Sequence, residues 1–189
     1  DRSSAASDVY KRQSLKRMEQ LILSMLKITR LDTGNIIFEK KSCRVSELIA
    51  HSVNELTARA KNENKQIQID GDGEQKLICD MEWTGEAIGN IVKNALDHTQ
   101  VGGIVRITWN RAPAMFQIFI SDNGSGIAPE DIHHIFKRFY RSKHSIDTQG
   151  IGLGLPLAKS IIEGQGGVIS VQSESGKGTL FTLSFLTEL

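Results

Sequence analysis

Residues 86–98 read EAIGNIVKNALDH, and their spacing predicts an amphipathic helix with a polar function on one side. Apolar side chains recur every three or four residues and form one face: Ile88, Ile91, Val92, Ala95 and Leu96. Asn90 and Asn94 stand one turn apart, with Asp97 and His98 close by. Asparagine is a poor helix former, so two of them at this spacing need a reason. An amide oxygen is a suitable Mg²⁺ ligand, although a solvated helix face would have the same pattern.

Three glycine turns follow this helix along the chain. The first, DNGSG at residues 122–126, ends the apolar strand MFQIFIS. Gly124 and Gly126, spaced by one residue, would let a ligand approach the backbone closely. The Asp122 carboxylate would repel a phosphate, but it suits a hydrogen bond from an exocyclic amine such as that of adenine. Taken alone, the motif fits an ordinary strand-to-helix turn equally well.

The second turn, GIGLGL at residues 150–155, opens a predicted helix whose backbone N–H groups would offer an anion site. It does not match a dinucleotide-binding fingerprint, because the polar residues 141–149 replace the strand that should precede it. The third turn, GKGT at residues 176–179, is not a Walker A loop, because Gly178 stands where Ser or Thr must follow Lys177. The combination of three glycine turns with the polar helix therefore carries the functional prediction.

The composition indicates a soluble globular protein. The chain has 189 residues, 23 Lys plus Arg and 22 Asp plus Glu, a formal net charge of +1 and 39% hydrophobic residues. This near-balance argues against a nucleic-acid partner bound through a broad basic face. Cys43 and Cys79 lack the spacing of a zinc site, and we expect two reduced, buried thiols. No apolar run approaches the roughly 20 residues of a membrane span, and no signal peptide is visible.

The N-terminal segment predicts a coiled-coil-like helix over residues 8–31, capped by Asp8 and stopped by Gly34. Its apolar residues follow the spacing of a coiled-coil seam: Leu15, Met18, Ile22 and Met25. So broad an apolar face cannot be stable alone in water. The helix either lies on its own domain or joins an intermolecular helix bundle.

The remaining pattern predicts an α+β two-layer sandwich, because strands and helices segregate along the chain. Strands are expected at residues 36–39, 66–70, 76–80, 103–109, 114–121, 167–173 and 179–185. Helices are expected at residues 45–62, 81–98, 130–140 and 153–163. Asp80 should cap the helix at 81–98, and the turn at 71–73 should join the two strands beside it.

Taken together, these motifs resemble the ATP-binding catalytic domain of sensor histidine kinases, within the gyrase, Hsp90, histidine kinase and MutL superfamily. The similar segments, in family order, are NIVKNALDHT (N box), DNGSG (G1), FKRFYR (F box), GIGLGL (G2) and GKGT. Residues 15–34, ending in ITRLDTG, are similar to the second helix of the dimerisation and phosphotransfer hairpin, so residues 1–33 are expected to be part of that hairpin. The resemblance implies a Bergerat-type fold, a mixed sheet plus helices, with a catalytic domain at residues 34–189.

The resemblance also implies ATP and Mg²⁺ as ligands. Asn94 would coordinate Mg²⁺ and act in catalysis, and Asn90 would support the metal or a phosphate oxygen. Asp122 would accept a hydrogen bond from the adenine amino group, with Thr179 assisting through water. Gly124 and Gly126 would leave room for the base. The resemblance further places near the nucleotide Asp97, His98 and Ile127.

Residues 127–149 would form a lid over the triphosphate, anchored by Phe136 and Phe139. Within this lid Arg138, Arg141 or Lys143 would reach the phosphates, although a solvated lid surface is the alternative for all three. The hinge and the phosphate-facing amides would come from the G2 box, that is Gly150, Gly152, Leu153, Gly154 and Leu155.

Asn90 decides the expected chemistry. Hydrolysing relatives carry a glutamate there as general base, whereas an asparagine cannot take a proton at neutral pH. This favours phosphoryl transfer over hydrolysis. No histidine has the context of a phosphoacceptor in the family, neither His51 and His98 nor His133, His134 and His144.

The acceptor histidine is therefore expected upstream of Asp1. We do not expect this chain alone to autophosphorylate. The resemblance implies a homodimer, a response-regulator partner and a cytoplasmic location, with the full-length protein attached to a membrane. Three alternatives stay open: a gyrase- or Hsp90-like ATPase, a non-catalytic nucleotide-binding module, and an anti-sigma-type serine kinase.

Overall fold

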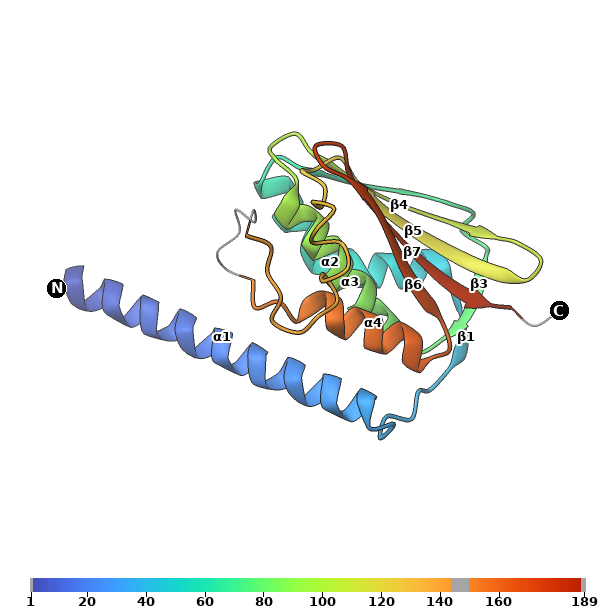
Figure 1. Cartoon of the computed structure of the whole chain (residues 1–189), viewed down its shortest axis with the longest axis horizontal. Helices are drawn as coiled ribbons and strands as arrows, with labels where there is room; N and C mark the ends of the chain where they lie inside the picture. Colours follow the sequence, from blue (N-terminus) through green and yellow to red (C-terminus); the bar gives the residue numbers. More distant parts are fainter. Residues whose placement is uncertain (1, 144–149, 188–189) are drawn as a thin grey trace.

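The computed structural model describes residues 2–143 and 150–187 of the chain, and Figure 1 shows their arrangement. The helices are α1 (Arg2–Asp32), α2 (Val45–Asn62), α3 (Met81–His98) and α4 (Gly154–Gly164). The strands are β1 (Lys41–Arg44), β2 (Gln66–Asp70), β3 (Lys76–Cys79), β4 (Ile104–Arg111), β5 (Met115–Asp122), β6 (Val168–Glu174) and β7 (Gly178–Leu186). The predicted α+β class is confirmed.

A mixed sheet forms one layer of the sandwich. Its strand order is β2-β4-β5-β7-β6, with β2 and β4 parallel and the other neighbours antiparallel. Along β5 and β7 alternate side chains are buried, as expected for a sheet covered on one face. Helices α2, α3 and α4 cover that face (Figure 1). The strand pairing places Asp122, the last residue of β5, opposite Thr179 of β7.

Helix α3 lies against both α2 and α4 in the second layer. Its predicted apolar face is confirmed, and all five of its members are essentially inaccessible: Ile88, Ile91, Val92, Ala95 and Leu96. Asp80 caps this helix as predicted, because its carboxylate accepts a hydrogen bond from the Trp83 N–H at 3.2 Å. Burial of one face fixes which way the polar side chains of α3 point.

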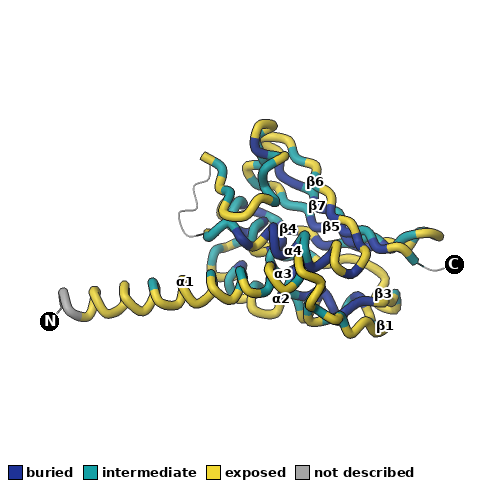
Figure 2. The backbone as a smooth tube through the Cα atoms, turned by 60° about the horizontal axis from the view of Figure 1, so that its bottom comes forward, coloured by how far each residue is buried: buried dark blue, intermediate teal, exposed yellow. Residues whose placement is uncertain are grey.

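Helix α1 extends away from the sandwich, and only its C-terminal part packs on it (Figure 2). Ile28 is fully buried there, and Lys27 forms a 2.7 Å ion pair with Glu86 of α3. Farther toward the N-terminus the seam residues Leu15, Met18 and Ile22 stay 66%, 60% and 54% exposed. Packing on its own domain therefore accounts for one end of α1 and leaves the rest of its apolar stripe uncovered.

The predicted C-terminal end of α1 is confirmed, and the predicted N-terminal end is wrong. Gly34, with a φ of +67°, lies just past the end of the helix as predicted. The prediction of Asp8 as N-cap is wrong, because the helix already begins at Arg2.

Two other local predictions are also wrong, a strand at 36–39 and a helix at 130–140. Residues 36–39 form no strand, and the Glu39 N–H instead donates to the Asp80 carboxylate at 2.9 Å. The strands on either side of the turn at 71–73 belong to different sheets: β2 joins β4, and β3 joins β1 in a separate two-stranded sheet. Residues 130–140 form successive turns and no α-helix, because their backbone bonds span three residues, as from the His134 N–H to the Asp131 carbonyl.

The remaining expectations concern membranes and thiols. Among the described helices, α1 included, none combines the length and apolar character that crossing a bilayer requires. Cys79 is a buried free thiol as expected, whereas Cys43 is only partly buried. Residues 144–149, the last part of the predicted lid, lie outside the described residues.

Candidate functional site

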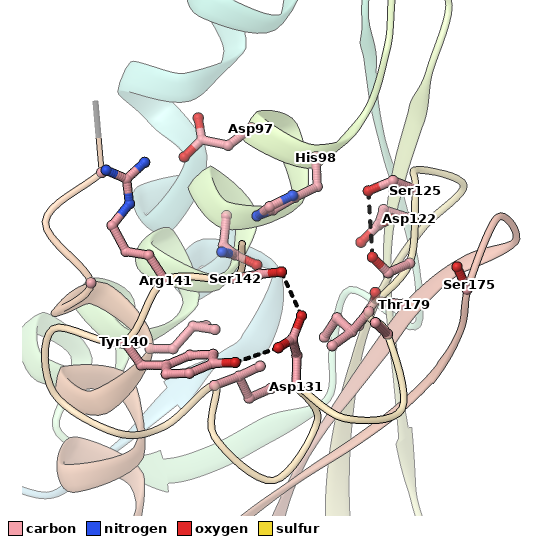
Figure 3. A pocket seen from close by; sticks show the side chains of 18 residues that line it. Asp97, His98, Asp122, Ser125, Asp131, Tyr140, Arg141, Ser142, Ser175 and Thr179 are labelled. Carbon is pink, nitrogen blue, oxygen red and sulfur yellow. Dashed lines mark hydrogen bonds between the residues drawn. The ribbon is translucent and has the colours of Figure 1, made fainter. Parts of the chain in front are cut away.

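A cavity of about 440 Å³ lies where the end of α3, the loop after β5 and the start of α4 meet, and Figure 3 shows its side chains. This volume is in the usual range for small-molecule sites. Eleven of the predicted site residues line it: Asn94, Asp97, His98, Asp122, Gly126, Ile127, Arg141, Gly150, Gly152, Leu155 and Thr179. Six do not: Asn90, Gly124, Arg138, Lys143, Leu153 and Gly154. The structure therefore brings motifs far apart in the sequence into one cavity.

Asp122 combines partial burial with a carboxylate that faces the cavity (Figure 3). Burial raises the pKa of this carboxyl above its usual value, although hydrogen bonding from the Gly124 N–H and the nearby His98 oppose the shift. The Gly124 N–H donates to the Asp122 Oδ1 at 2.9 Å. A carboxylate fixed in this way keeps acceptor capacity for a donor on a ligand.

The glycines of the DNGSG turn have a different physical role from the predicted one. A Cβ on Gly124 would lie 2.2 Å from the His98 carbonyl oxygen, and one on Gly126 would lie 2.2 Å from the Glu174 carbonyl oxygen. Both positions therefore require glycine because protein backbone packs against them. Gly126 also has a φ of +69°, which favours glycine. The loop is consequently held between the end of α3 and the turn after β6.

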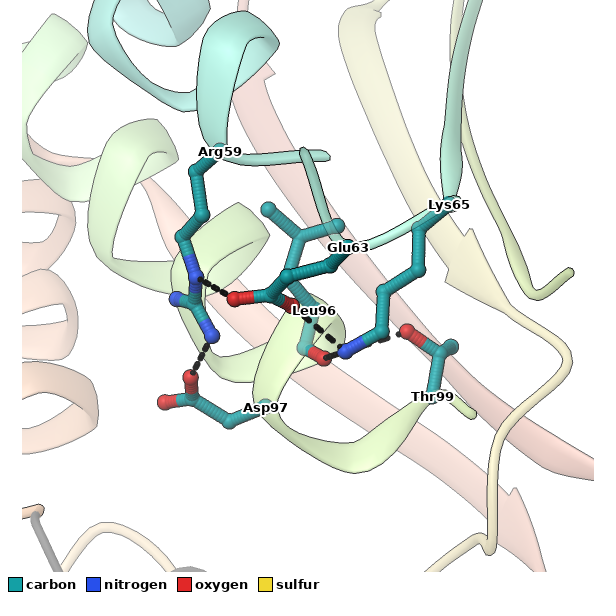
Figure 4. Close-up of polar contacts among 6 residues, drawn as sticks. All are labelled: Arg59, Glu63, Lys65, Leu96, Asp97 and Thr99. Carbon is teal, nitrogen blue, oxygen red and sulfur yellow. Dashed lines mark hydrogen bonds and ion pairs between the residues drawn. The ribbon is translucent and has the colours of Figure 1, made fainter. Parts of the chain in front are cut away.

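Helix α3 presents Asn94, Asp97 and His98 to the cavity from its last two turns. Asp97 is already engaged, because the Arg59 guanidinium on α2 donates to its Oδ1 at 2.6 Å (Figure 4). Asn94 is therefore the amide that lines the cavity on this helix. Across the described ranges, no three His, Cys, Asp or Glu side chains gather as a metal cluster. A single amide oxygen fits Mg²⁺, which usually keeps several waters and takes other ligands from phosphates.

Two basic residues hold the end of α3 from outside the cavity. Arg59 also donates to Glu63 at 2.7 Å, and Lys65 bridges Glu63 and the Leu96 carbonyl, each at 2.7 Å (Figure 4). Hydrogen bonds first from Lys65 and then from Arg59 lower the pKa of the Glu63 carboxyl. Lys65 thus binds one of the carbonyls that a helix C-terminus leaves without an intrahelical partner. This network fixes the helix turn that carries Asp97 and His98.

The GIGLGL segment reaches the cavity through Gly150, Gly152 and Leu155. Gly152 has a φ of +76°, and a Cβ there would lie 2.8 Å from the Tyr140 carbonyl oxygen, so glycine is required. Helix α4 begins at Gly154 without a side-chain cap, which leaves its first N–H groups suited to an anion. The Asn90 side chain lies next to Gly154, about 4 Å from where a Cβ would stand.

The three side chains predicted to bind phosphates differ in their position relative to the cavity. Arg141 lines the cavity. Lys143 is exposed and does not line it. Arg138 forms an ion pair with Asp32 at the end of α1, so it faces the helix instead of the cavity. Of the predicted anchors, Phe136 packs edge-on against Phe181, while Phe139 is largely exposed.

Sequence reasoning missed a carboxylate in this cavity. Asp131 is buried and accepts hydrogen bonds from the Tyr140 hydroxyl and the Ser142 hydroxyl (Figure 3). The bond to Asp131 raises the pKa of the Tyr140 phenol. The other lining residues that were not predicted individually are Ser125, Ala128, Ile135 and Ser175. No local pattern marks Asp131, because its partners follow it by nine and eleven residues in an irregular segment.

The part of the sequence that lines this cavity matches a family of known proteins. Residues 79–189 match the family described as histidine kinase-, DNA gyrase B- and HSP90-like ATPase. The chain is 28% identical over 170 residues to the sensor-like histidine kinase SenX3 of Mycobacterium tuberculosis, and 33% identical over 171 residues to the sensor histidine kinase RppB of Synechocystis. Each alignment covers 89% of this chain but only 42% and 38% of the relative. The chain therefore spans less than half of either relative.

A solved structure agrees with the fold. The Acinetobacter baumannii histidine kinase AdeS superposes with a TM-score of 0.78 at 17% identity, covering 91% of this chain and 79% of that one. At this identity the likeness establishes the fold, including the mixed sheet and its helical layer.

Proposed function

Since this chain belongs to the family of histidine kinase-, DNA gyrase B- and HSP90-like ATPases, we propose that it is the ATP-binding catalytic portion of a sensor histidine kinase. In this proposal residues 34–189 bind ATP, and residues 1–33 are part of the dimerisation and phosphotransfer hairpin. The γ-phosphoryl group goes to a histidine on another part of the intact protein. The observation that carries the proposal is the placement of Asp122, His98 and Asn94 around one cavity.

Asp122 supports recognition of adenine. Its Oδ1 already accepts the Gly124 N–H, and the carboxylate lines the cavity beside Thr179. A carboxylate accepts a hydrogen bond from the adenine amino group, whereas guanine has a carbonyl oxygen at that position and would repel it. The Asp122 side chain therefore selects adenine over guanine. Thr179 assists through water.

The opposite side of the cavity suits the phosphates. Asn94 would hold Mg²⁺, which supplies charge neutralisation at the β- and γ-phosphates when bound. The uncapped start of α4 and the Arg141 guanidinium would bind phosphate oxygens. Asn90, beside the first residue of α4, would orient these groups. Positioning and electrostatic stabilisation account for most of the rate in phosphoryl transfer.

The same residues favour transfer to an imidazole over hydrolysis. Asn90 and Asn94 are amides, and neither can accept the proton of an attacking water. An imidazole nitrogen needs no such base, because its lone pair attacks phosphorus directly. In that step an N–P bond forms, the bond from phosphorus to the ADP oxygen breaks, and the imidazole releases its other proton to solvent. The phosphoryl group would then pass to an aspartate of a response regulator.

The uncovered stripe of α1 supports the rest of the proposal. Leu15, Met18 and Ile22 are exposed on a helix whose far end packs on the catalytic domain. We propose that a second helix of the same hairpin and a second copy of the protein cover this stripe. The catalytic portion would act in the cytoplasm, where ATP and response regulators are present, with the whole protein attached to a membrane.

A transfer assay tests the proposal directly. The chain is mixed with Mg²⁺, ATP labelled on its γ-phosphate, and a separate protein that carries the acceptor helix of the same kinase. Acid-labile, base-stable label on the acceptor protein is the expected result, and Asn94→Ala should abolish it. Rapid phosphate release without labelled protein would identify a hydrolysing ATPase instead. Tight ATP binding with neither product would identify a nucleotide-binding module.

A further inference from the structure

A pair of thiols lies on the side of the domain formed by the small sheet, outside the nucleotide cavity. Cys43 on β1 and Cys79 on β3 have their sulfur atoms 3.3 Å apart. The antiparallel register pairs Cys43 with Leu77 and Lys41 with Cys79, so the two thiols are diagonal neighbours on the same face. Two cysteines 36 positions apart in sequence are therefore held in contact by strand pairing.

The two thiols differ in exposure and acidity. Cys79 is 1% exposed, whereas Cys43 is only partly buried. The hydrogen bond between the two thiols lowers the pKa of the Cys43 thiol. The same contact, together with burial, raises the pKa of Cys79. Cys43 is thus the more accessible sulfur and the one that carries the negative charge more readily.

A small oxidant can reach this pair. An open groove is lined by both cysteines and by side chains of both charges, among them Lys41 and Glu39, which form an ion pair at 3.4 Å. Partial exposure and a neighbouring second thiol are two features of a cysteine that oxidises reversibly.

We propose that Cys43 and Cys79 form a modification site at which a peroxide converts the two thiols into an intramolecular disulfide. The Cys43 thiolate attacks hydrogen peroxide, forming an S–O bond as the O–O bond breaks and hydroxide leaves. The Cys79 sulfur then attacks the resulting sulfenic acid, which releases hydroxide and yields the S–S bond. Overall two thiols lose two electrons and two protons, and one peroxide becomes two waters.

Little movement separates the two states. Closing the sulfur distance from 3.3 Å to the roughly 2.05 Å of a disulfide requires an approach of about 1.3 Å. The bond would join β1, which follows the segment leaving α1, to β3, which ends at the Asp80 cap of α3. The disulfide would therefore connect the segment that follows α1 to the N-terminal end of α3, the helix that carries Asn94.

Mass spectrometry tests the proposal on the full chain. After treatment with hydrogen peroxide and removal of the excess by catalase, the denatured protein should be about 2 Da lighter and resist alkylation at both cysteines. A tryptic digest should contain residues 42–44 linked to residues 77–93, and dithiothreitol should separate them. Two alkylatable thiols after peroxide, or linkage only between chains, would overturn the proposal.

Single substitutions test the assigned roles of the two sulfurs. In Cys79→Ala the Cys43 sulfenic acid has no partner, so a dimedone adduct should accumulate on Cys43. In Cys43→Ser the buried Cys79 should remain unlabelled. Labelling of Cys79 instead of Cys43 would reverse the assignment and contradict the proposal. The wild-type measurement does not depend on whether either variant folds.

Discussion

The Arg59 guanidinium on α2 donates through Nη2 to the Asp97 carboxylate on α3 at 2.6 Å and through Nε to Glu63 at 2.7 Å. Asp97 lines the proposed nucleotide cavity, but Arg59 does not. An arginine outside the cavity therefore positions a carboxylate inside it. Both side chains are substantially buried, so the ion pair is less screened than a surface pair would be.

Replacing Arg59 by alanine should destabilise the domain and weaken nucleotide binding together. Asp97 and Glu63 would each lose a charged donor, which we expect to lower the free energy of unfolding by about 1–3 kcal/mol. Denaturant unfolding and calorimetric titration with ATP measure the two effects. Lys61→Ala, an exposed charge on the same helix, is the matched control and should change neither. Equal effects of the two substitutions would remove Arg59 from its positioning role.

Asp122→Asn should weaken ATP binding by about 1.5–3 kcal/mol, because the hydrogen bond to the base would lose its charged acceptor. The substitution should not destabilise the ligand-free protein, since burial raises the pKa of this carboxyl and thus already disfavours its charged form. Calorimetry with ATP and thermal unfolding without it separate the two effects. Asp70→Asn, at an exposed position, is the control. ATP affinities within twofold of the wild type would exclude the adenine contact.

The contrast between Gly124 and Asp131 shows what the sequence could predict about this site. The DNGSG turn was predicted to contact a ligand from a local pattern, an acidic residue with spaced glycines, and Asp122 and Gly126 line a cavity at the end of β5. The reason for glycine at position 124 was not local: the His98 carbonyl packs against it from another helix. Asp131 was missed for the same reason, since only the folded lid segment brings the Tyr140 and Ser142 hydroxyls to it.

The fold was predicted best where a hydrophobic period continues over many residues. The helix at 81–98 and the strand at 115–122 follow their periods closely. Short segments were predicted poorly, because their backbone bonds go to distant partners. The Glu39 N–H donates to the Asp80 carboxylate, and β3 pairs with β1 instead of its neighbour in sequence. The sequence alone offers no period from which to infer either contact.

Asn94→Ala should abolish the dependence of ATP affinity on Mg²⁺. Asn94 is the amide of α3 that lines the cavity, and alanine there would leave the metal without its protein ligand. Titrations with and without Mg²⁺ give the ratio of affinities, which should fall toward one in the variant. Asn54→Ala on the exposed side of α2 should keep the wild-type ratio. An unchanged ratio in Asn94→Ala would place the metal elsewhere.

The lowered pKa of the Glu63 carboxyl should make the stability of the domain depend on pH. Hydrogen bonds from Lys65 and Arg59 lower its folded-state pKa, so its contribution to stability is present above the unfolded value near 4.5 and is lost as the pH falls through the folded-state pKa. Unfolding measured from pH 7 downward should show stability falling below about pH 5. In Glu63→Gln this fall should be shallower. Superimposable pH profiles for the variant and the wild type would contradict the assignment.

Arg138 provides the last test, because its observed partner competes with its predicted one. The structure pairs it with Asp32 on α1, whereas the family resemblance placed it among three cations of which one or more would reach the phosphates. If one guanidinium serves both partners in turn, Asp32→Asn should tighten Mg²⁺–ATP binding. The gain should not exceed about fivefold, because both side chains of the pair are more than two-fifths exposed and such pairs contribute at most about 1 kcal/mol. The same substitution in an Arg138→Ala background should have no effect on affinity. A gain that persists without Arg138 would show that Asp32 acts through another group, and no gain in either background would limit Arg138 to holding α1 against the lid segment.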